Sequence, residues 1–275
     1  MTFAAFIISF ADSDPVKRKA RFAVHNSQLD EWLEHTDINI NVLSMGYREG
    51  DYYEDTRVIY HDLAERKASE ARYAAFELFY QSDADWGIIM DNDATLYHDE
   101  QHNSAYKLIH EMDQQLPKYD SISMFVPIDP RKEPFSKRLA RPFYKNNHAF
   151  FRHMDVKGSM VFVRNLRKSG EKEIFPDKTY DWCEDGKLAM DAVAAGHRVM
   201  QSSNAVLKEK GLSSSAFGDA DVDRKPFMKL ANERMVLEFG PPLSMSEKKP
   251  HLLDRRKWLE ENWKGLDHLF VPKLL

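Results

Sequence analysis

An unbroken apolar run that ends in two closely spaced aspartates is the feature that most constrains this chain. Residues 86–90 have the sequence Trp-Gly-Ile-Ile-Met and are followed directly by Asp91-Asn92-Asp93. Short apolar runs of this kind are typical of strands buried in a parallel sheet. Open α/β sheets bind their ligands at the carboxyl ends of such strands. The sequence therefore predicts a ligand site at Asp91 and Asp93.

Two carboxylates this close favour a cation between them, and hard divalent ions take oxygen ligands. We therefore predict that Asp91 and Asp93 bind Mn²⁺ or Mg²⁺, which would carry the phosphates of a nucleotide. Four other Asp-x-Asp triplets occur in the chain, starting at Asp12, Asp83, Asp219 and Asp221, so the triplet alone is weak evidence. Only the triplet at Asp91 directly follows an apolar strand. The alternative is an ordinary strand-end turn in which Asp93 caps the next segment.

The composition allows one large domain in a reducing compartment. The chain has 275 residues, a single cysteine and a formal net charge of -5, so it lacks a global basic signature for nucleic acid. One cysteine excludes an internal disulfide and favours the cytosol. The apolar start at residues 1–8 lacks a basic region before it and is better interpreted as a first strand than as a signal peptide.

Hydrophobic periodicity predicts an α/β chain in which strands and helices alternate. The predicted strands cover residues 3–10, 38–43, 57–60, 86–90, 121–126, 156–163 and 197–200. The predicted helices cover about 16–33, 63–80, 108–112 and 186–195, the last closed by Gly196. We expect residues 1–225 to form the catalytic domain and residues 226–275 to form a helical C-terminal elaboration packed on the same domain.

The segment 127–153 combines basic and aromatic side chains and has few acidic ones. The aromatic side chains include Phe143 and Tyr144, and the basic ones include Lys145 and Arg152. Such a surface suits a polyanionic acceptor. The alternative is a solvated loop with a few packing aromatic residues.

The order of these motifs resembles that of GT-A glycosyltransferases over about residues 3 to 215. A helix with small residues precedes the Asp-x-Asp strand, Gly158-Ser159 stands where the family places small residues against donor and acceptor, and Glu184-Asp185 stands at a helix start. The resemblance implies a Rossmann-like mixed, mostly parallel sheet flanked by helices. It also implies a UDP-sugar as donor and Asp185 as the general base, with Glu184 as the less favoured candidate, in an inverting transfer.

The same resemblance implies where the nucleotide binds. Lys67 and Arg72 stand on the helix that the family uses for base and ribose contacts, and Tyr47 and Arg48 follow the second strand. Many members place a metal-binding histidine after the Glu-Asp helix. Here the corresponding positions are Lys208 and Lys210, predicted to lie in a polar turn. A protonated ammonium cannot bind a metal but can bind the diphosphate directly.

Within the family, the chain resembles bacteriophage enzymes that glycosylate 5-hydroxymethylated pyrimidines in DNA, the group associated with TET-like hydroxylases. This resemblance implies double-stranded DNA carrying 5-hydroxymethylcytosine as acceptor, and the cytoplasm of the host cell as location. Phe143, Tyr144, Lys145 and Arg152 would contact the acceptor, and the cluster at 255–257 would extend the phosphate contacts.

Two other classes of function remain open at this stage. Asp91-Asn92-Asp93-Ala94-Thr95 also fits the first motif of haloacid-dehalogenase-like phosphatases, although that motif normally ends the first strand of its fold. A sugar- or DNA-binding module without catalysis would explain the basic aromatic segment but not the two carboxylate motifs. A glycosyltransferase acting on a polysaccharide or a protein is a further alternative.

Overall fold

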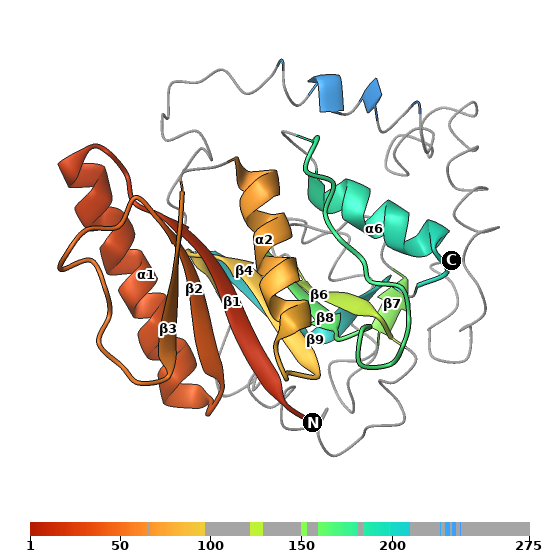
Figure 1. The fold of residues 1–275 in the computed structure, drawn as a ribbon, viewed down its shortest axis with the longest axis horizontal. Coiled ribbons are helices and arrows are strands. Elements are labelled where there is room, and N and C mark those ends of the chain that lie inside the picture. Colours follow the sequence, from red (N-terminus) through yellow and green to blue (C-terminus); the bar gives the residue numbers. More distant parts are fainter. Residues whose placement is uncertain are drawn as a thin grey trace.

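The fold was obtained as a computed structural model (Figure 1). It describes residues 1–64, 67–96, 122–128, 150–152, 159–180, 184–197 and 199–209, and seven positions between 226 and 237. Three helices are described over more than one turn, namely α1 (Pro15–His35), α2 (Ala68–Gln81) and α6 (Glu184–Ala194). The strands are β1 (Phe3–Phe10), β2 (Asn39–Met45), β3 (Val58–Leu63), β4 (Trp86–Asp91), β5 (Ala94–Leu96), β6 (Met124–Ile128), β7 (Phe150–Arg152), β8 (Met160–Arg164) and β9 (Val199–Glu209).

The nine strands in the described part of the chain join one mixed sheet in the order β3-β2-β1-β4-β8-β6-β9-β5, with β7 paired to β9. The half β3-β2-β1-β4 is parallel, whereas β8 runs antiparallel to both β4 and β6. The predicted α/β class, a mixed sheet flanked by helices, is confirmed. The pairing also shows that β3 lies at one edge of this sheet, paired with β2.

Two helices cover the parallel half from opposite faces. The connection through α1 leads from β1 to β2, toward the β3 edge of the sheet. The connection through α2 leads in the opposite direction, from β3 past β2 and β1 to β4. Right-handed crossovers in opposite directions place their helices on opposite faces. Figure 1 shows α2 lying across β1 and β4, with α1 along the β3 end of the sheet. Both faces of β1 and β4 are therefore buried, which explains their continuous apolar sequences.

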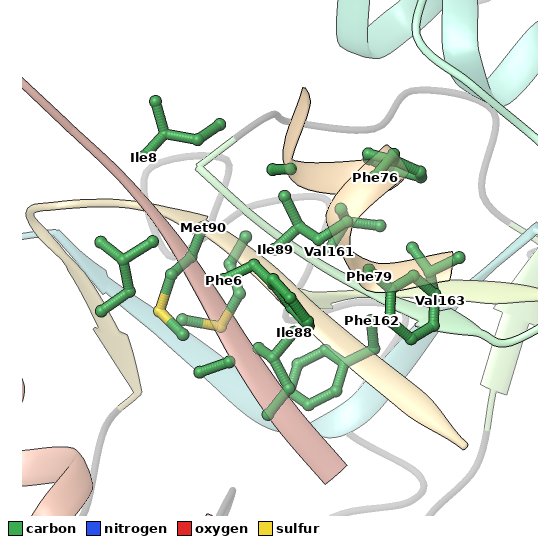
Figure 2. Packing of buried hydrophobic residues seen from close by; sticks show 14 of the residues in the cluster. Phe6, Ile8, Phe76, Phe79, Ile88, Ile89, Met90, Val161, Phe162 and Val163 are labelled. Carbon is green, nitrogen blue, oxygen red and sulfur yellow. The ribbon is translucent and has the colours of Figure 1, made fainter. Parts of the chain in front are cut away.

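The core lies between the central strands and α2, where Figure 2 shows Phe76 and Phe79 of the helix near strand residues such as Ile89 and Val161. The rings of Phe6 and Phe79 meet edge to face with centroids 5.7 Å apart. These side chains are almost completely removed from water. Burial of this kind is the main stabilising contribution to the parallel half of the sheet.

Gly87 allows α2 to lie this close to β4. A Cβ atom at Gly87 would lie 2.6 Å from Cδ2 and 2.9 Å from Cε2 of Phe79, much closer than carbon atoms normally approach. The sequence placed this glycine in a buried strand, but its role depends on a helix residue that the sequence does not pair with it.

We expect Gly87→Ala to destabilise the protein by about 1–3 kcal/mol, because it overpacks the contact with Phe79. Replacing the ring by a smaller side chain, Phe79→Leu, should make room for the new methyl group. Denaturant unfolding of the two single variants and the double variant measures this coupling. Additive losses in the double variant would contradict the steric explanation.

Several predicted boundaries are corrected by the structure. The helix expected from Leu63 begins at Ala68, because β3 continues to Leu63 and the Glu70 carboxylate accepts a hydrogen bond from the Lys67 N–H at 3.3 Å, which caps the helix start. The strand expected at 197–200 is β9, which extends to Glu209. The positive φ of 87° at Gly196 fits the predicted end of α6.

The last part of the chain is described at only a few positions, all helical, at residues 226, 229–231, 233–234 and 237. Arg234 donates a hydrogen bond to the Thr179 carbonyl at 2.9 Å, so this part contacts the segment that precedes α6. The division at residue 225 stays a prediction. Within the described residues, no helix has the length and apolar character needed to cross a membrane.

Candidate active site

The carboxyl ends of β1, β2 and β4 meet at one edge of the sheet and are tied together by side chains. The amide of Asn92 donates to the Ser9 hydroxyl at 3.0 Å, and that hydroxyl lies 2.6 Å from the hydroxyl of Tyr47. These residues follow or end three different strands. The edge predicted from the apolar run at 86–90 is therefore the place where Asp91 and Asp93 lie.

A buried glutamine from α1 fixes the turn that carries the two aspartates. The amide nitrogen of Gln28 donates to the carbonyl of Asp91 at 2.8 Å and to the carbonyl of Ala94 at 2.6 Å. The Asp91 N–H donates to the Ser159 carbonyl at 3.0 Å. Gln28 is fully buried, and its side-chain oxygen lies 3.2 Å from Nδ1 of His25. The backbone of the turn is thus held by a side chain of α1 and by the residue that precedes β8.

His25 and Gln28 are not among the site residues that the sequence predicts. A signal was present, because the buried stripe of α1 includes polar residues where a core helix normally has apolar ones: Arg21, His25 and Gln28 beside Leu29 and Trp32. Buried polar residues at helical spacing indicate a hydrogen-bonded network, and this one supports the aspartate turn.

The buried imidazole predicts acid sensitivity. Burial lowers the pKa of His25 from 6.5 to about 4, and the hydrogen bond with Gln28 opposes this only in part. The unfolded chain therefore binds a proton on this group between pH 6.5 and about 4 that the folded chain does not. The contribution of neutral His25 to the free energy of unfolding is therefore fully present above pH 6.5. It falls by about 3 kcal/mol in total as the pH drops from 6.5 to about 4.

We expect His25→Gln to flatten this part of the pH dependence, because the substitution removes the group that titrates. Urea unfolding at pH 7 and pH 4.5 gives the comparison, and His35→Gln in the last turn of α1 is the matched control that should keep the wild-type slope. If the free energy of unfolding of His25→Gln falls between pH 7 and pH 4.5 by as much as that of the wild type, His25 is not the group that causes the acid sensitivity.

Arg72 joins the two carboxylate motifs of the chain. Its Nη2 lies 3.1 Å from Oδ1 of Asp91, and its Nε lies 3.1 Å from Oε1 of Glu184. Burial alone would lower the pKa of the guanidinium, but the charges of Asp91, Glu184 and Asp185 outweigh it and raise the pKa. The Glu-Asp motif at the start of α6 and the Asp-x-Asp motif at the end of β4 therefore lie at the same place.

The two acidic residues of α6 differ in their surroundings. Glu184 is buried against Arg72, whereas Asp185 is half-buried and one of its oxygens accepts a hydrogen bond from the Gly186 N–H at 2.7 Å. Both belong to the first turn of α6, where carboxylates interact favourably with the helix dipole.

A second buried arginine lies near the other aspartate of the motif. Nη2 of Arg21 lies 3.7 Å from Oδ2 of Asp12, a buried carboxylate that follows β1. Burial lowers the pKa of Arg21, while Asp12 and Asp93 act in the opposite direction. Asp12 belongs to another Asp-x-Asp triplet, and its partner Asp14 caps α1 through the N–H groups of residues 16 and 17.

The predicted nucleotide-contacting residues are placed as follows. Tyr47 packs among the rings of Phe22, Tyr52 and Tyr60 just beyond β2, and Arg48 is exposed beside it. Lys67 is exposed and precedes α2. Whether these residues and Arg72 contact a nucleotide stays a prediction.

Lys208 was expected in a polar turn but lies in β9, opposite Thr95 of β5. Its ammonium group is 3.8 Å from a carboxylate oxygen of Glu31 on α1. The pairing with β5 still brings the strand that carries Lys208 next to the segment that follows Asp93. Its predicted contact with a diphosphate stays a prediction.

Other predicted site residues fall outside the described part of the chain. These are Gly158, Lys210, Phe143, Tyr144 and Lys145, together with the basic cluster at 255–257. Of Arg152 the structure gives only the backbone, which pairs with Met200 as part of β7.

The aspartate turn offers a donor set that fits a hard divalent cation. Both side chains supply carboxylate oxygens, and Asp91 keeps 39% of its side chain exposed despite the contact with Arg72. Within the described residues, no group of three or more acidic, histidine or cysteine side chains is arranged to hold a metal. Mg²⁺ commonly keeps several water and phosphate oxygens among its ligands, so one or two carboxylates are a usual protein contribution to its site.

Comparison with known proteins gives likeness of structure only. No protein-family model and no curated protein sequence matches the chain. A solved structure assigned as a nucleotide-diphospho-sugar transferase from Desulfovibrio desulfuricans G20 covers 73% of this chain and 80% of its own, with 8% identity and a TM-score of 0.45. Glucosyl-3-phosphoglycerate synthase from Mycobacterium tuberculosis, solved with Mg²⁺ and UDP, covers 88% and 81%, with 10% identity and a TM-score of 0.45. At this level neither likeness assigns an activity to this chain.

Proposed function

We propose that this protein is a metal-dependent glycosyltransferase that moves a sugar from a UDP-sugar to an acceptor hydroxyl, with inversion at the anomeric carbon. The observation that carries the proposal is the contact of one buried guanidinium, that of Arg72, with Asp91 and Glu184. It brings an oxygen-donor pair suited to a metal diphosphate next to a helix start with a second pair of carboxylates. Donor activation and proton removal need these two sets of groups at one place.

On the donor side, Asp91 and Asp93 would hold the cation, in the turn whose backbone is bound by Gln28. A cation at this position would supply Lewis-acid stabilisation of the negative charge on the departing diphosphate. Tyr47, Arg48 and Lys67 are the candidates for nucleotide contacts, because they lie on segments that adjoin the carboxyl ends of the parallel strands. Lys208 and Lys210 are candidates for direct contact with the diphosphate.

On the acceptor side, Asp185 takes the proton of the acceptor hydroxyl. The hydroxyl oxygen then forms a bond to the anomeric carbon as the bond from that carbon to the diphosphate oxygen breaks, and UDP leaves with the electron pair. Asp185 is favoured over Glu184, because Glu184 is buried in the ion pair with Arg72 whereas Asp185 is half-buried. A base within hydrogen-bond reach is what makes an alcohol an effective nucleophile.

For the acceptor, we propose 5-hydroxymethylcytosine in double-stranded DNA. The hydroxymethyl group of this base lies in the major groove. To reach it, an enzyme must contact the DNA phosphates to align itself with the duplex, and it must then either enter the groove or flip the base out of the helix. The segment from 131 to 152 supplies cationic and aromatic residues in the sequence, with Lys145 and Arg152 near Phe143 and Tyr144.

Transfer of labelled sugar from a panel of UDP-sugars to 5-hydroxymethylcytosine DNA tests the proposal, with unmodified DNA of the same sequence as control. We expect labelling of the modified DNA alone, together with DNA binding that weakens as salt increases. Absence of labelling with every donor, or binding independent of salt, would contradict the DNA acceptor. Hydrolysis of a phosphomonoester at Asp91 instead would support the phosphatase alternative.

A further inference from the structure

Arg72 is placed to do more than neutralise charge. It comes from α2, whereas its partners come from the end of β4, 19 residues away, and from the first turn of α6, 112 residues away. Only 6% of its side chain is exposed, and only 11% of that of Glu184. A buried ion pair of this kind fixes the relative position of the elements that supply it.

We propose that Arg72 is a positioning residue that sets the distance between the donor site at Asp91 and the general base at Asp185, an inference that rests on the proposed function. It acts through Glu184, the residue directly before the base. Because Glu184 is held by Arg72, the first turn of α6 is tied to the aspartate turn. The link thereby keeps a fixed distance between the anomeric carbon of the donor and the carboxylate that removes the acceptor proton.

The geometry requires a guanidinium. Nε and Nη2 are neighbouring donors on one planar edge, so two carboxylates that bind them are held at a fixed spacing and angle. A lysine ammonium at this position keeps the positive charge but offers a single point of attraction without a fixed direction. Charge alone therefore does not reproduce the arrangement that links Asp91 to Glu184.

This role differs measurably from a contact with the nucleotide. Loss of a nucleotide contact weakens donor binding and raises the KM for the donor. Loss of register between donor and base leaves donor binding in place and lowers kcat, and a displacement of about 1 Å can reduce the rate about 100-fold. A role in folding alone would change neither parameter in a variant that is fully folded at the assay temperature.

The test uses UDP release from the UDP-sugar that the full-length protein hydrolyses fastest in the presence of Mg²⁺, with water in place of the acceptor. For Arg72→Lys we expect kcat about 100-fold lower, an unchanged KM for the donor, and an unchanged Kd for UDP with Mg²⁺ by calorimetry. Glu184→Gln should give a similar loss of kcat. The double variant should lose no more than either single one, because both break the same link.

Arg164→Lys is the matched control. Arg164 forms an ion pair with Glu171 at 2.6 Å and lies opposite Trp86, at the far end of β4 from Asp91. It should keep the kcat and KM of the wild type. Thermal unfolding of each variant establishes that the assay temperature is below its transition.

Three results would overturn the inference. An Arg72→Lys variant that keeps the wild-type kcat shows that the link is not needed for catalysis. A variant with normal kcat but a raised KM and weaker UDP binding shows that Arg72 contacts the nucleotide. Losses that multiply in the double variant show that Arg72 and Glu184 act separately. If the wild type neither binds UDP nor releases it from any donor, the proposed function itself fails, and the role of Arg72 fails with it.

Discussion

Asp93→Ala is expected to reduce sugar transfer by at least about 1,000-fold while leaving the protein folded. The Asp93 carboxylate is one of the two protein ligands proposed for the cation. Stabilisation of a leaving diphosphate by a metal contributes several kcal/mol, and a loss of about 4 kcal/mol corresponds to a rate about 1,000-fold lower. The backbone of the turn is held by Gln28 and Ser159 and does not depend on the Asp93 side chain for those contacts. Initial rates at saturating Mg²⁺ or Mn²⁺ provide the measurement.

The chain contains a matched control for this change. Asp83 and Asp85 form the same triplet at the opposite end of β4, where Asp85 pairs with Lys168 and Asp83 is exposed. Asp83→Ala should retain the wild-type rate. An Asp93→Ala variant that transfers sugar at the wild-type rate, or a wild type that keeps its rate in the presence of a chelator, would exclude the metal role.

Asp185→Asn is expected to lower kcat by a factor of about 100 to 10,000, the usual contribution of a positioned general base. The amide keeps the shape of the side chain but cannot accept the proton of the acceptor hydroxyl. Donor binding should be unaffected, because Asp91 and Asp93 are unchanged. The measurement is kcat and KM for both substrates, with analysis of the anomeric configuration of the product.

Asp177→Asn is the control for Asp185. Its carboxylate accepts hydrogen bonds from the N–H and hydroxyl of Thr179 in the segment before α6, and an asparagine oxygen can take over both contacts. This variant should transfer sugar normally. A product that retains the anomeric configuration of the donor would rule out direct attack assisted by a single base, whatever the effect of Asp185→Asn on the rate.

The parallel half of the fold was predictable from the sequence because it follows local patterns. Residues 3–10 and 86–90 are buried on both faces, so they appear as continuous apolar runs. The end of α6 at Gly196 follows from backbone chemistry at one residue. The edge of the sheet where Asp91 lies then follows from the direction of the strands.

Other features were hidden because their cause is distant in the sequence. The polar residues in the middle of β9 have little strand preference of their own, and the strand is held by pairing with β6, β7 and β5. The insertion of β8 antiparallel to β4 has no local signature. The contact between Arg72 and Glu184 spans 112 residues, so the sequence indicated a nucleotide-binding helix but not the carboxylates that its arginine joins.

Release of UDP from a panel of UDP-sugars by the wild-type protein, with Mg²⁺ or Mn²⁺ and then with excess chelator, tests most directly whether the protein is a metal-dependent glycosyltransferase. We expect release from at least one donor in the presence of metal, loss of release with the chelator, and loss of release in Asp93→Ala. No release from any donor, or release that continues unchanged in the chelator and in Asp93→Ala, would contradict it.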